Sequence, residues 1–109
     1  MVTADDLRRE ALALEGTLEA PHFDRTAFKV ARIYVTLAAD GQTANFNFSP
    51  EEQELKTIVA PDTFTPLPNA WGKQGWTTAR LARMSERELA QALRIAWSHA
   101  LAKRTRRSR

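Results

Sequence analysis

The alternation of apolar and polar residues divides the chain into helices and strands. Near the N-terminus, Leu7, Ala11 and Leu14 recur at the spacing of one helix face. This pattern predicts an amphipathic helix over residues 4–15, with Gly16 at the position after the helix that often takes a left-handed backbone.

Period-two alternation then predicts an antiparallel sheet. The segments that alternate are residues 26–30, 33–37, 44–48 and 76–82. In the second segment Val35 is expected on the apolar face and Tyr34 on the opposite face. Asp40-Gly41 lies between the second and third segments, and this dipeptide favours a tight type I′ hairpin turn.

Two further helices are indicated by their first residues. Ser49 followed by Pro50 and two acids predicts a helix that ends near Val59. Its buried side is expected to consist of Leu55, Ile58 and Val59. A proline-rich loop over residues 61–68 follows this helix.

The last helix is predicted to begin with a capping box, in which Ser85 and Glu88 satisfy each other's backbone N–H groups. An apolar stripe follows at positions 89, 93, 97 and 101. The sheet has one apolar face, which needs a helix layer to cover it. We therefore expect an α+β, two-layer domain with an antiparallel sheet and helices packed on one face.

Length and charge define one domain and a tail. The 109 residues suit a single domain over 1–102. Five positive charges lie in the last seven residues, so the net charge of +3 becomes −2 for residues 1–102. We expect residues 103–109 to form a flexible basic tail, in which Lys103, Arg104, Arg106 and Arg107 could attract nucleic acid.

Several classes of protein and site are disfavoured by the composition. The chain has no cysteine, which excludes disulfides and thiolate metal sites. No apolar run approaches the length of a membrane span and no secretory leader is recognisable, so we expect a cytoplasmic protein without membrane contact. We expect a monomer.

The most distinctive segment is Trp71-Gly72-Lys73-Gln74-Gly75-Trp76. It is interpreted either as a structural corner with both indoles buried, or as an aromatic surface that binds a ligand. In the second case the candidate binding residues form one set. They are Trp71, Gly72, Lys73, Gly75, Trp76, Arg80 and Arg83, with the basic residues of the tail.

Catalytic and metal-binding groups are sparse. His22 lies in a turn between strands and is a candidate ligand contact, but no second histidine, nucleophile or carboxylate pair accompanies it. The acids near position 52 are explained by the dipole of their helix. We therefore predict no enzymatic activity, no metal site and no cofactor.

Nearly all of residues 4–103 resembles the MmcQ/YjbR family of small bacterial proteins. The resemblance rests on the segments 11–16 (ALALEG), 22–23 (HF), 28–30 (FKV), 48–52 (FSPEE) and 71–77 (WGKQGWT). Where the family has a glycine-containing turn, this chain has Ala31-Arg32. The resemblance implies a frataxin-like (CyaY-like) fold, and members of the family are often labelled DNA-binding.

Two functions follow as expectations. The leading hypothesis is a non-enzymatic module that binds DNA weakly or conditionally, through the tryptophan segment and nearby basic residues. The alternative is a protein- or small-ligand-binding domain that uses the Trp71–Trp76 corner, with the basic tail incidental. The exposure of the two indoles separates a binding surface from a structural corner.

Overall fold

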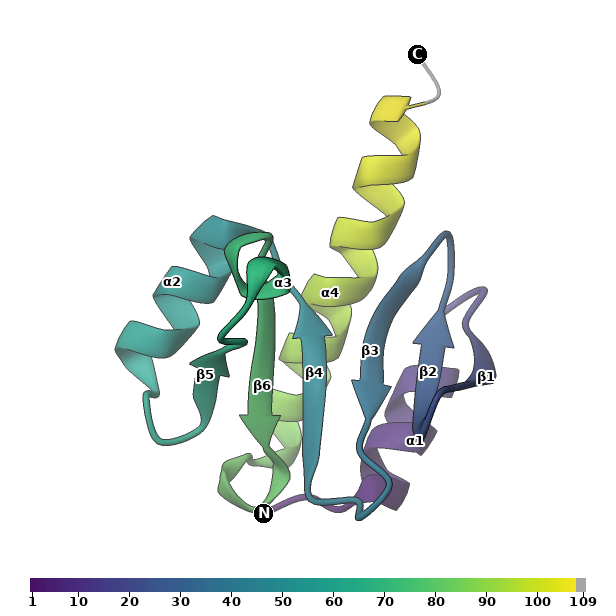
Figure 1. Ribbon diagram of the computed structural model, residues 1–109. Coiled ribbons are helices and arrows are strands. Elements are labelled where there is room, and N and C mark those ends of the chain that lie inside the picture. Colours follow the sequence, from purple (N-terminus) through teal and green to yellow (C-terminus); the bar gives the residue numbers. More distant parts are fainter. Residues whose placement is uncertain (108–109) are drawn as a thin grey trace.

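The protein folds around a six-stranded antiparallel sheet (Figure 1). The computed structural model describes the backbone of residues 1–107 and the side chains of residues 1–102. The strand order is β1-β2-β3-β4-β6-β5. The strands are β1 (Leu18–His22), β2 (Arg25–Lys29), β3 (Ile33–Leu37), β4 (Thr43–Asn47), β5 (Phe64–Pro66) and β6 (Trp76–Arg80). The α+β architecture predicted from the sequence is confirmed.

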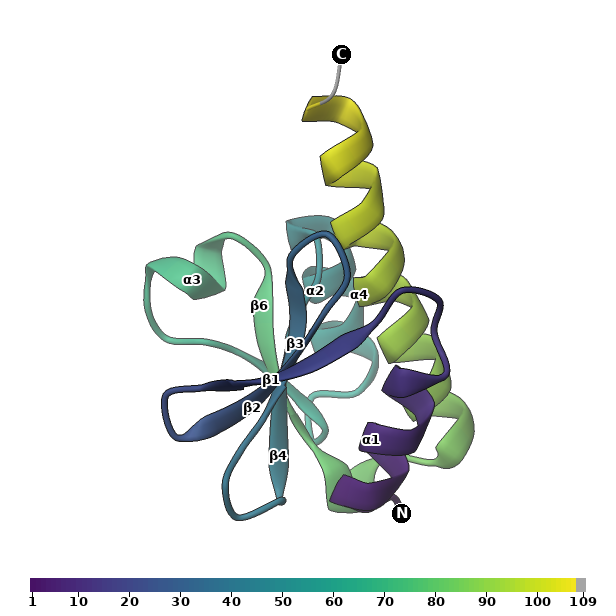
Figure 2. The same ribbon diagram turned by 90° about the vertical axis from the view of Figure 1, so that its right-hand side faces the viewer.

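The long helices lie on one side of this sheet. The helices are α1 (Ala4–Leu12), α2 (Pro50–Val59), α3 (Ala70–Lys73) and α4 (Glu86–Arg107), with a 3-10 turn at Leu81–Arg83. Figure 2 shows α1, α2 and α4 on one side of the strands, while the short α3 and the tip of the β1–β2 hairpin lie on the other. The sheet therefore has a covered face and an open face.

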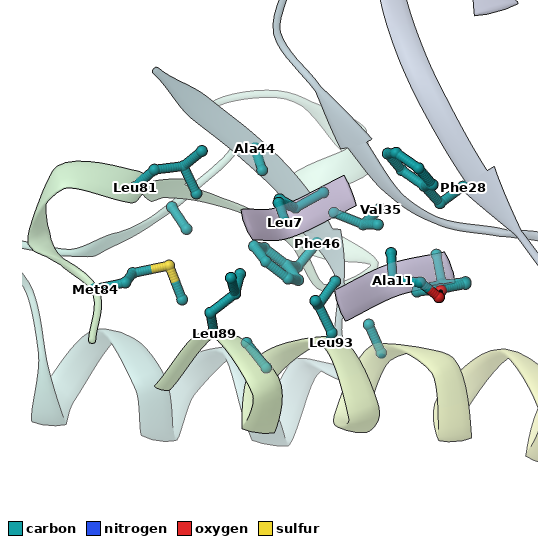
Figure 3. Packing of buried hydrophobic residues seen from close by; sticks show 14 of the residues in the cluster. Leu7, Ala11, Phe28, Val35, Ala44, Phe46, Leu81, Met84, Leu89 and Leu93 are labelled. Carbon is teal, nitrogen blue, oxygen red and sulfur yellow. The ribbon is translucent and has the colours of Figure 1, made fainter. Parts of the chain in front are cut away.

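The core fills the space between the covered face and the helices. Phe28, Val35 and Phe46 lie in register on three neighbouring strands and are fully buried. Leu89 and Leu93 of α4 point toward them, as Figure 3 shows. Burial of each such side chain contributes about 1.5–3 kcal/mol. The predicted capping box of α4 is confirmed by Ser85 and Glu88, whose side chains accept each other's backbone N–H at 2.8 and 3.1 Å.

Tyr34 departs from the predicted alternation, because it joins the core beside Val35. The register between β2 and β3 shifts after Phe28, so that Lys29 pairs with Ile33 and Tyr34 has no partner across the strands. A bulge of this kind lets two consecutive side chains point to one face. The buried Tyr34 hydroxyl contacts Thr17 Oγ1 at 2.8 Å and donates to the carbonyl of Ala11 at 3.3 Å.

The β3–β4 hairpin is present, but its turn is not the predicted two-residue type I′. Ala38 N–H donates to the Thr43 carbonyl, which closes a longer loop. In this loop Gly41 has a positive φ of 73° and Asp40 does not. Asp40 instead accepts a hydrogen bond from the Gln42 N–H at 3.0 Å. This side-chain bond favours an Asx turn over the mirror-image turn.

The orientation of α2 is opposite to the prediction. Leu55, Ile58 and Val59, expected on its buried side, are all exposed. The helix instead docks through Lys56, whose ammonium lies 6.0 and 5.7 Å from the ring centroids of Phe48 and Phe64. An aliphatic stem with a cation over aromatic faces can occupy such an interface where a hydrophobic residue is expected.

Several element boundaries also differ from prediction. The first helix ends at Leu12 and not at residue 15, and β6 ends at Arg80. The strand β5 forms within the loop expected over residues 61–68, and α3 forms in the tryptophan segment, for which no helix was predicted. Helix α4 continues to Arg107, so five residues of the expected tail have helical backbone. Their Lys and Arg content suits a helix, and positive charge is favourable near its C-terminus.

Candidate functional site

The open face of the sheet carries a pocket of about 330 Å³. Its floor includes Thr36 of β3 and Asn45 of β4, which are paired across the two strands and project away from the core. Because side chains alternate along a strand, the apolar residues beside them point to the covered face and the polar residues point into this pocket. Ile33 and Leu67 form an apolar part of the pocket wall.

Trp71 and Trp76 form the aromatic wall of the pocket. The backbone N–H of Trp71 donates to Asn69 Oδ1 at 3.0 Å. This hydrogen bond caps α3, and Trp71 lies in the first turn of that helix. Trp76 begins β6. The side chain of Trp71 is 56% exposed, whereas Trp76 is half-buried. Neither indole is sealed in the core, so the segment is an aromatic surface as well as a corner.

The two glycines of the segment have a packing role. A Cβ at Gly72 would lie 1.8 Å from the Leu67 carbonyl oxygen. A Cβ at Gly75 would lie 1.9 Å from the Phe48 carbonyl oxygen, and Gly75 also has a φ of 114°. Both positions therefore require glycine for backbone close approach. Their close packing holds α3 and the start of β6 at the pocket's edge.

Arg25 presents a fixed guanidinium to the pocket. Its Nε donates to Thr36 Oγ1 at 2.8 Å and its Nη2 donates to the Thr36 carbonyl at 3.2 Å. A guanidinium has five N–H donors, so three remain for a ligand. Two hydrogen bonds to a buried residue orient the group before any ligand arrives, which lowers the entropic cost of binding.

Arg32 and Asn45 supply further donors. The Arg32 guanidinium makes no ion pair or hydrogen bond with the residues whose side chains are described. Asn45 Oδ1 accepts from Thr78 Oγ1 at 2.8 Å, which fixes the amide and leaves its NH₂ group to donate. The charged groups among the described pocket residues are both arginines, and no carboxylate lines it. The pocket therefore favours an anion with a flat apolar part.

His22 was expected in a turn, but it is the last residue of β1, where it pairs with Arg25 and lines the pocket. The next residue, Phe23, has a positive φ of 59° and is 93% exposed. A left-handed backbone costs an ordinary L-residue about 1–2 kcal/mol. The rings of His22 and Phe23 meet edge to face, with centroids 4.8 Å apart. The hairpin thus extends the aromatic wall beyond the pocket.

Lys73, Arg80 and Arg83 do not line this pocket. Lys73 is exposed and lines a neighbouring hollow with Gln53 and Pro68. Arg80 is at the opposite end of β6 from Trp76, about 13 Å along the strand, and lines another hollow with Arg83. The side chains of Lys103, Arg104, Arg106 and Arg107 lie outside the described part of the structure, as do residues 108–109.

Sequence reasoning missed the four polar and charged residues that line the pocket beside His22: Arg25, Arg32, Thr36 and Asn45. Thr36 and Asn45 had a detectable signal, because they occupy the polar positions of two alternating strands. Arg25 and Arg32 lie at strand ends and had none. Only the pairing of β2 with β3, of β3 with β4 and of β4 with β6 brings them near Trp76.

Metal-binding clusters and membrane spans are both absent from the described residues. Over residues 1–102, no group of three or more histidines and carboxylates is arranged to hold a metal ion. Within the described chain, no helix combines the length and apolar character that crossing a bilayer requires.

Comparison with known proteins places the chain in a structural context. A family model described as YjbR matches residues 12–99. The crystal structure of protein DR2400 of Deinococcus radiodurans, with a DUF419 domain, is similar with a TM-score of 0.76 and 26% identity. The match covers 89% of this chain and 77% of that one. No curated protein matches.

Proposed function

We propose that this chain, which belongs to the YjbR family, binds single-stranded nucleic acid by taking one unpaired base into the open-face pocket. The main support for this proposal is that an exposed Trp71 and two arginines line one concave site. No carboxylate is among the described residues that line it. Stacked bases need an aromatic face, and the adjoining phosphates need positive charge.

The size of the pocket favours an unpaired base over duplex DNA. A volume of about 330 Å³ lies at the small end of ligand sites and suits a single planar ring system. The bases of a duplex are stacked on one another and cannot stack on Trp71 unless they are extruded. The proposal therefore narrows the DNA-binding hypothesis to unpaired strands.

The polar groups of the pocket suit the other parts of a nucleotide. The remaining donors of Arg25 suit phosphate oxygens, as does the guanidinium of Arg32, which has no partner among the described side chains, since arginine forms bidentate pairs with them. The Asn45 NH₂ group suits an acceptor on a base edge. This is a binding role, and it assigns no chemical step to these residues.

Fluorescence anisotropy tests the proposal. A labelled oligothymidylate of about eight nucleotides is titrated with the full chain at about 50 mM salt, beside a hairpin duplex of the same charge. We expect Trp71→Ala to weaken single-strand binding by roughly 5- to 150-fold, because one base then lacks its stacking partner. Ile58→Ala, at an exposed apolar residue of α2, is the matched control and should bind as the wild type does.

The same titration separates the proposal from the small-ligand alternative. If thymidine monophosphate displaces the oligonucleotide at equal affinity, the pocket serves a free small molecule. If the wild type binds no single strand at this salt, or Trp71→Ala binds equally well, the nucleic-acid function is wrong.

A further inference from the structure

We infer that Phe23 is a second stacking position, which holds the base next to the one in the pocket. This inference rests on the proposed function and extends its site from the open face to the tip of the β1–β2 hairpin. It predicts that the protein engages a strand of at least two successive unpaired nucleotides.

Phe23 occupies a backbone conformation that is costly for a bulky residue. The loop between the paired residues His22 and Arg25 contains only Phe23 and Asp24. Phe23 is the one non-glycine residue of the described chain with a positive φ, at 59°. A two-residue hairpin with positive φ at its first position ordinarily has glycine there. A bulky residue in this conformation is an outlier that folding alone does not favour.

The Phe23 side chain makes few contacts within the folded domain. Phe23 is 93% exposed, the most exposed among the described large apolar residues. Its ring meets that of His22 edge to face. This pair orients the Phe23 ring and leaves most of its surface in water. Both the backbone strain and the exposed aromatic surface are explained if a partner covers this ring.

Phe23 also lies next to the pocket. His22 lines the pocket together with Trp71 and Trp76, and its ring lies 4.8 Å from that of Phe23. Figure 2 shows the tip of the hairpin and α3 on the same side of the sheet. The aromatic series therefore continues from the pocket through His22 to Phe23. Arg25 follows in the hairpin and is held by Thr36, where it suits the phosphate between two bases.

Phe23→Gly tests the inference, because glycine relieves the positive φ while removing the ring. We expect this variant to bind an oligothymidylate of about eight nucleotides at least about 5-fold more weakly. Its melting temperature should not fall below that of the wild type, since the backbone is no longer strained. Weaker binding by a protein that is at least as stable cannot be attributed to misfolding.

Two further measurements sharpen the result. Thymidine monophosphate, which reaches only the pocket, should bind Phe23→Gly and the wild type equally. Phe23→Trp should restore the affinity for the longer strand, since an indole stacks at least as well as a phenyl ring. Phe23→Leu, which keeps an apolar side chain without an aromatic face, should not restore it.

The outcomes distinguish this inference from the function on which it rests. If Trp71→Ala abolishes binding and Phe23→Gly does not weaken it, the second stacking position is wrong and the pocket stands. If Phe23→Leu binds as the wild type does, the interaction is not stacking and the inference is again wrong. If the wild type binds no single strand, both proposals are wrong together.

Discussion

At the scale of single residues, two backbone positions hold the pocket in shape. Gly75 packs directly against the Phe48 carbonyl and takes a φ that side chains disfavour, while Gly72 abuts Leu67. Trp71 lies beside one of these glycines and Trp76 beside the other. The placement of both indoles therefore depends on close approaches that no side chain larger than hydrogen permits.

Gly75→Ala should destabilise the protein strongly. The added methyl would meet backbone that cannot rotate away, and the positive φ adds strain, for a total of about 2–4 kcal/mol in the free energy of unfolding. Gly16→Ala is the matched control, because it shares a positive φ but meets only a Val30 methyl at 3.2 Å. It should cost about 1 kcal/mol. Equal costs in chemical denaturation would contradict this account.

Tyr34 should make stability sensitive to alkaline pH. Burial raises the pKa of the Tyr34 hydroxyl above its ordinary value of 10.0, while the hydrogen bond with Thr17 opposes this shift. Since the folded pKa is raised, the stability that the neutral phenol contributes is complete below pH 10.0 and is lost as the pH rises through the folded pKa.

Tyr34→Phe isolates this effect. Near neutral pH it should cost about 1 kcal/mol, because phenylalanine cannot form the hydrogen bonds with Ala11 and Thr17. Denaturant titrations between about pH 8 and pH 11 should show the difference from the wild type shrinking. A difference that stays constant over this range would mean that Tyr34 ionises equally in the folded and unfolded chain.

At the scale of elements, α2 shows how polar interactions can outweigh an apolar stripe. Gln53 Nε2 donates to the carbonyls of Gly72 and Trp76 at 2.9 and 3.0 Å. Lys56 lies over the Phe48 and Phe64 rings. These interactions orient α2 so that Gln53 and Lys56 face the rest of the domain. The helix thereby stabilises the backbone segment that contains both tryptophans of the pocket.

The apolar stripe of α2 suggests that Ile58 matters more for stability than Lys56. The structure predicts the reverse order. Ile58→Gln changes a side chain that is 70% exposed, so stability should shift by no more than about 0.5 kcal/mol. Lys56→Ala removes a side chain that is 14% exposed and should cost about 1 kcal/mol. Thermal denaturation of the two variants checks this order, and the reverse order would show that α2 docks through its apolar side.

Periodicity predicted the longer elements because each has enough residues to display a repeat. The strands over Thr26–Val30 and Ile33–Leu37 were found this way, and so was the core side of α4. The three residues of β5 and four of α3 are too few to show one. Tyr34 was misplaced because a bulge is set by pairing with β2, which no local pattern reveals.

At the scale of the whole molecule, the site is assembled from segments far apart in the chain. His22 and Arg25 come from one hairpin, Asn45 from β4 and Trp71 from α3. The tryptophan segment could be singled out by composition alone. Its partners could not, because the strand order that brings them together depends on a crossover in which β6 pairs with β4.

The basic tail should contribute affinity without selectivity. Replacing the five cationic residues over 103–109 by Gln keeps the chain length and removes their charge. For single strands, the logarithm of affinity should then depend less steeply on salt, by up to about 0.7 for each phosphate that the tail no longer neutralises. The preference for single strand over duplex should remain. If that preference disappears in the neutralised variant, the tail and not the pocket carries the specificity.

The most direct test of the pocket uses the three indole N–H signals in a ¹H–¹⁵N correlation spectrum, recorded during titration with an oligothymidylate. Trp71 and Trp76 line the pocket, whereas the Trp97 indole donates to the Glu15 carbonyl at 2.9 Å. If a base enters the pocket, the signals of Trp71 and Trp76 should shift with one common binding curve while that of Trp97 does not. A titration in which neither pocket indole responds, or all three respond alike, would contradict it.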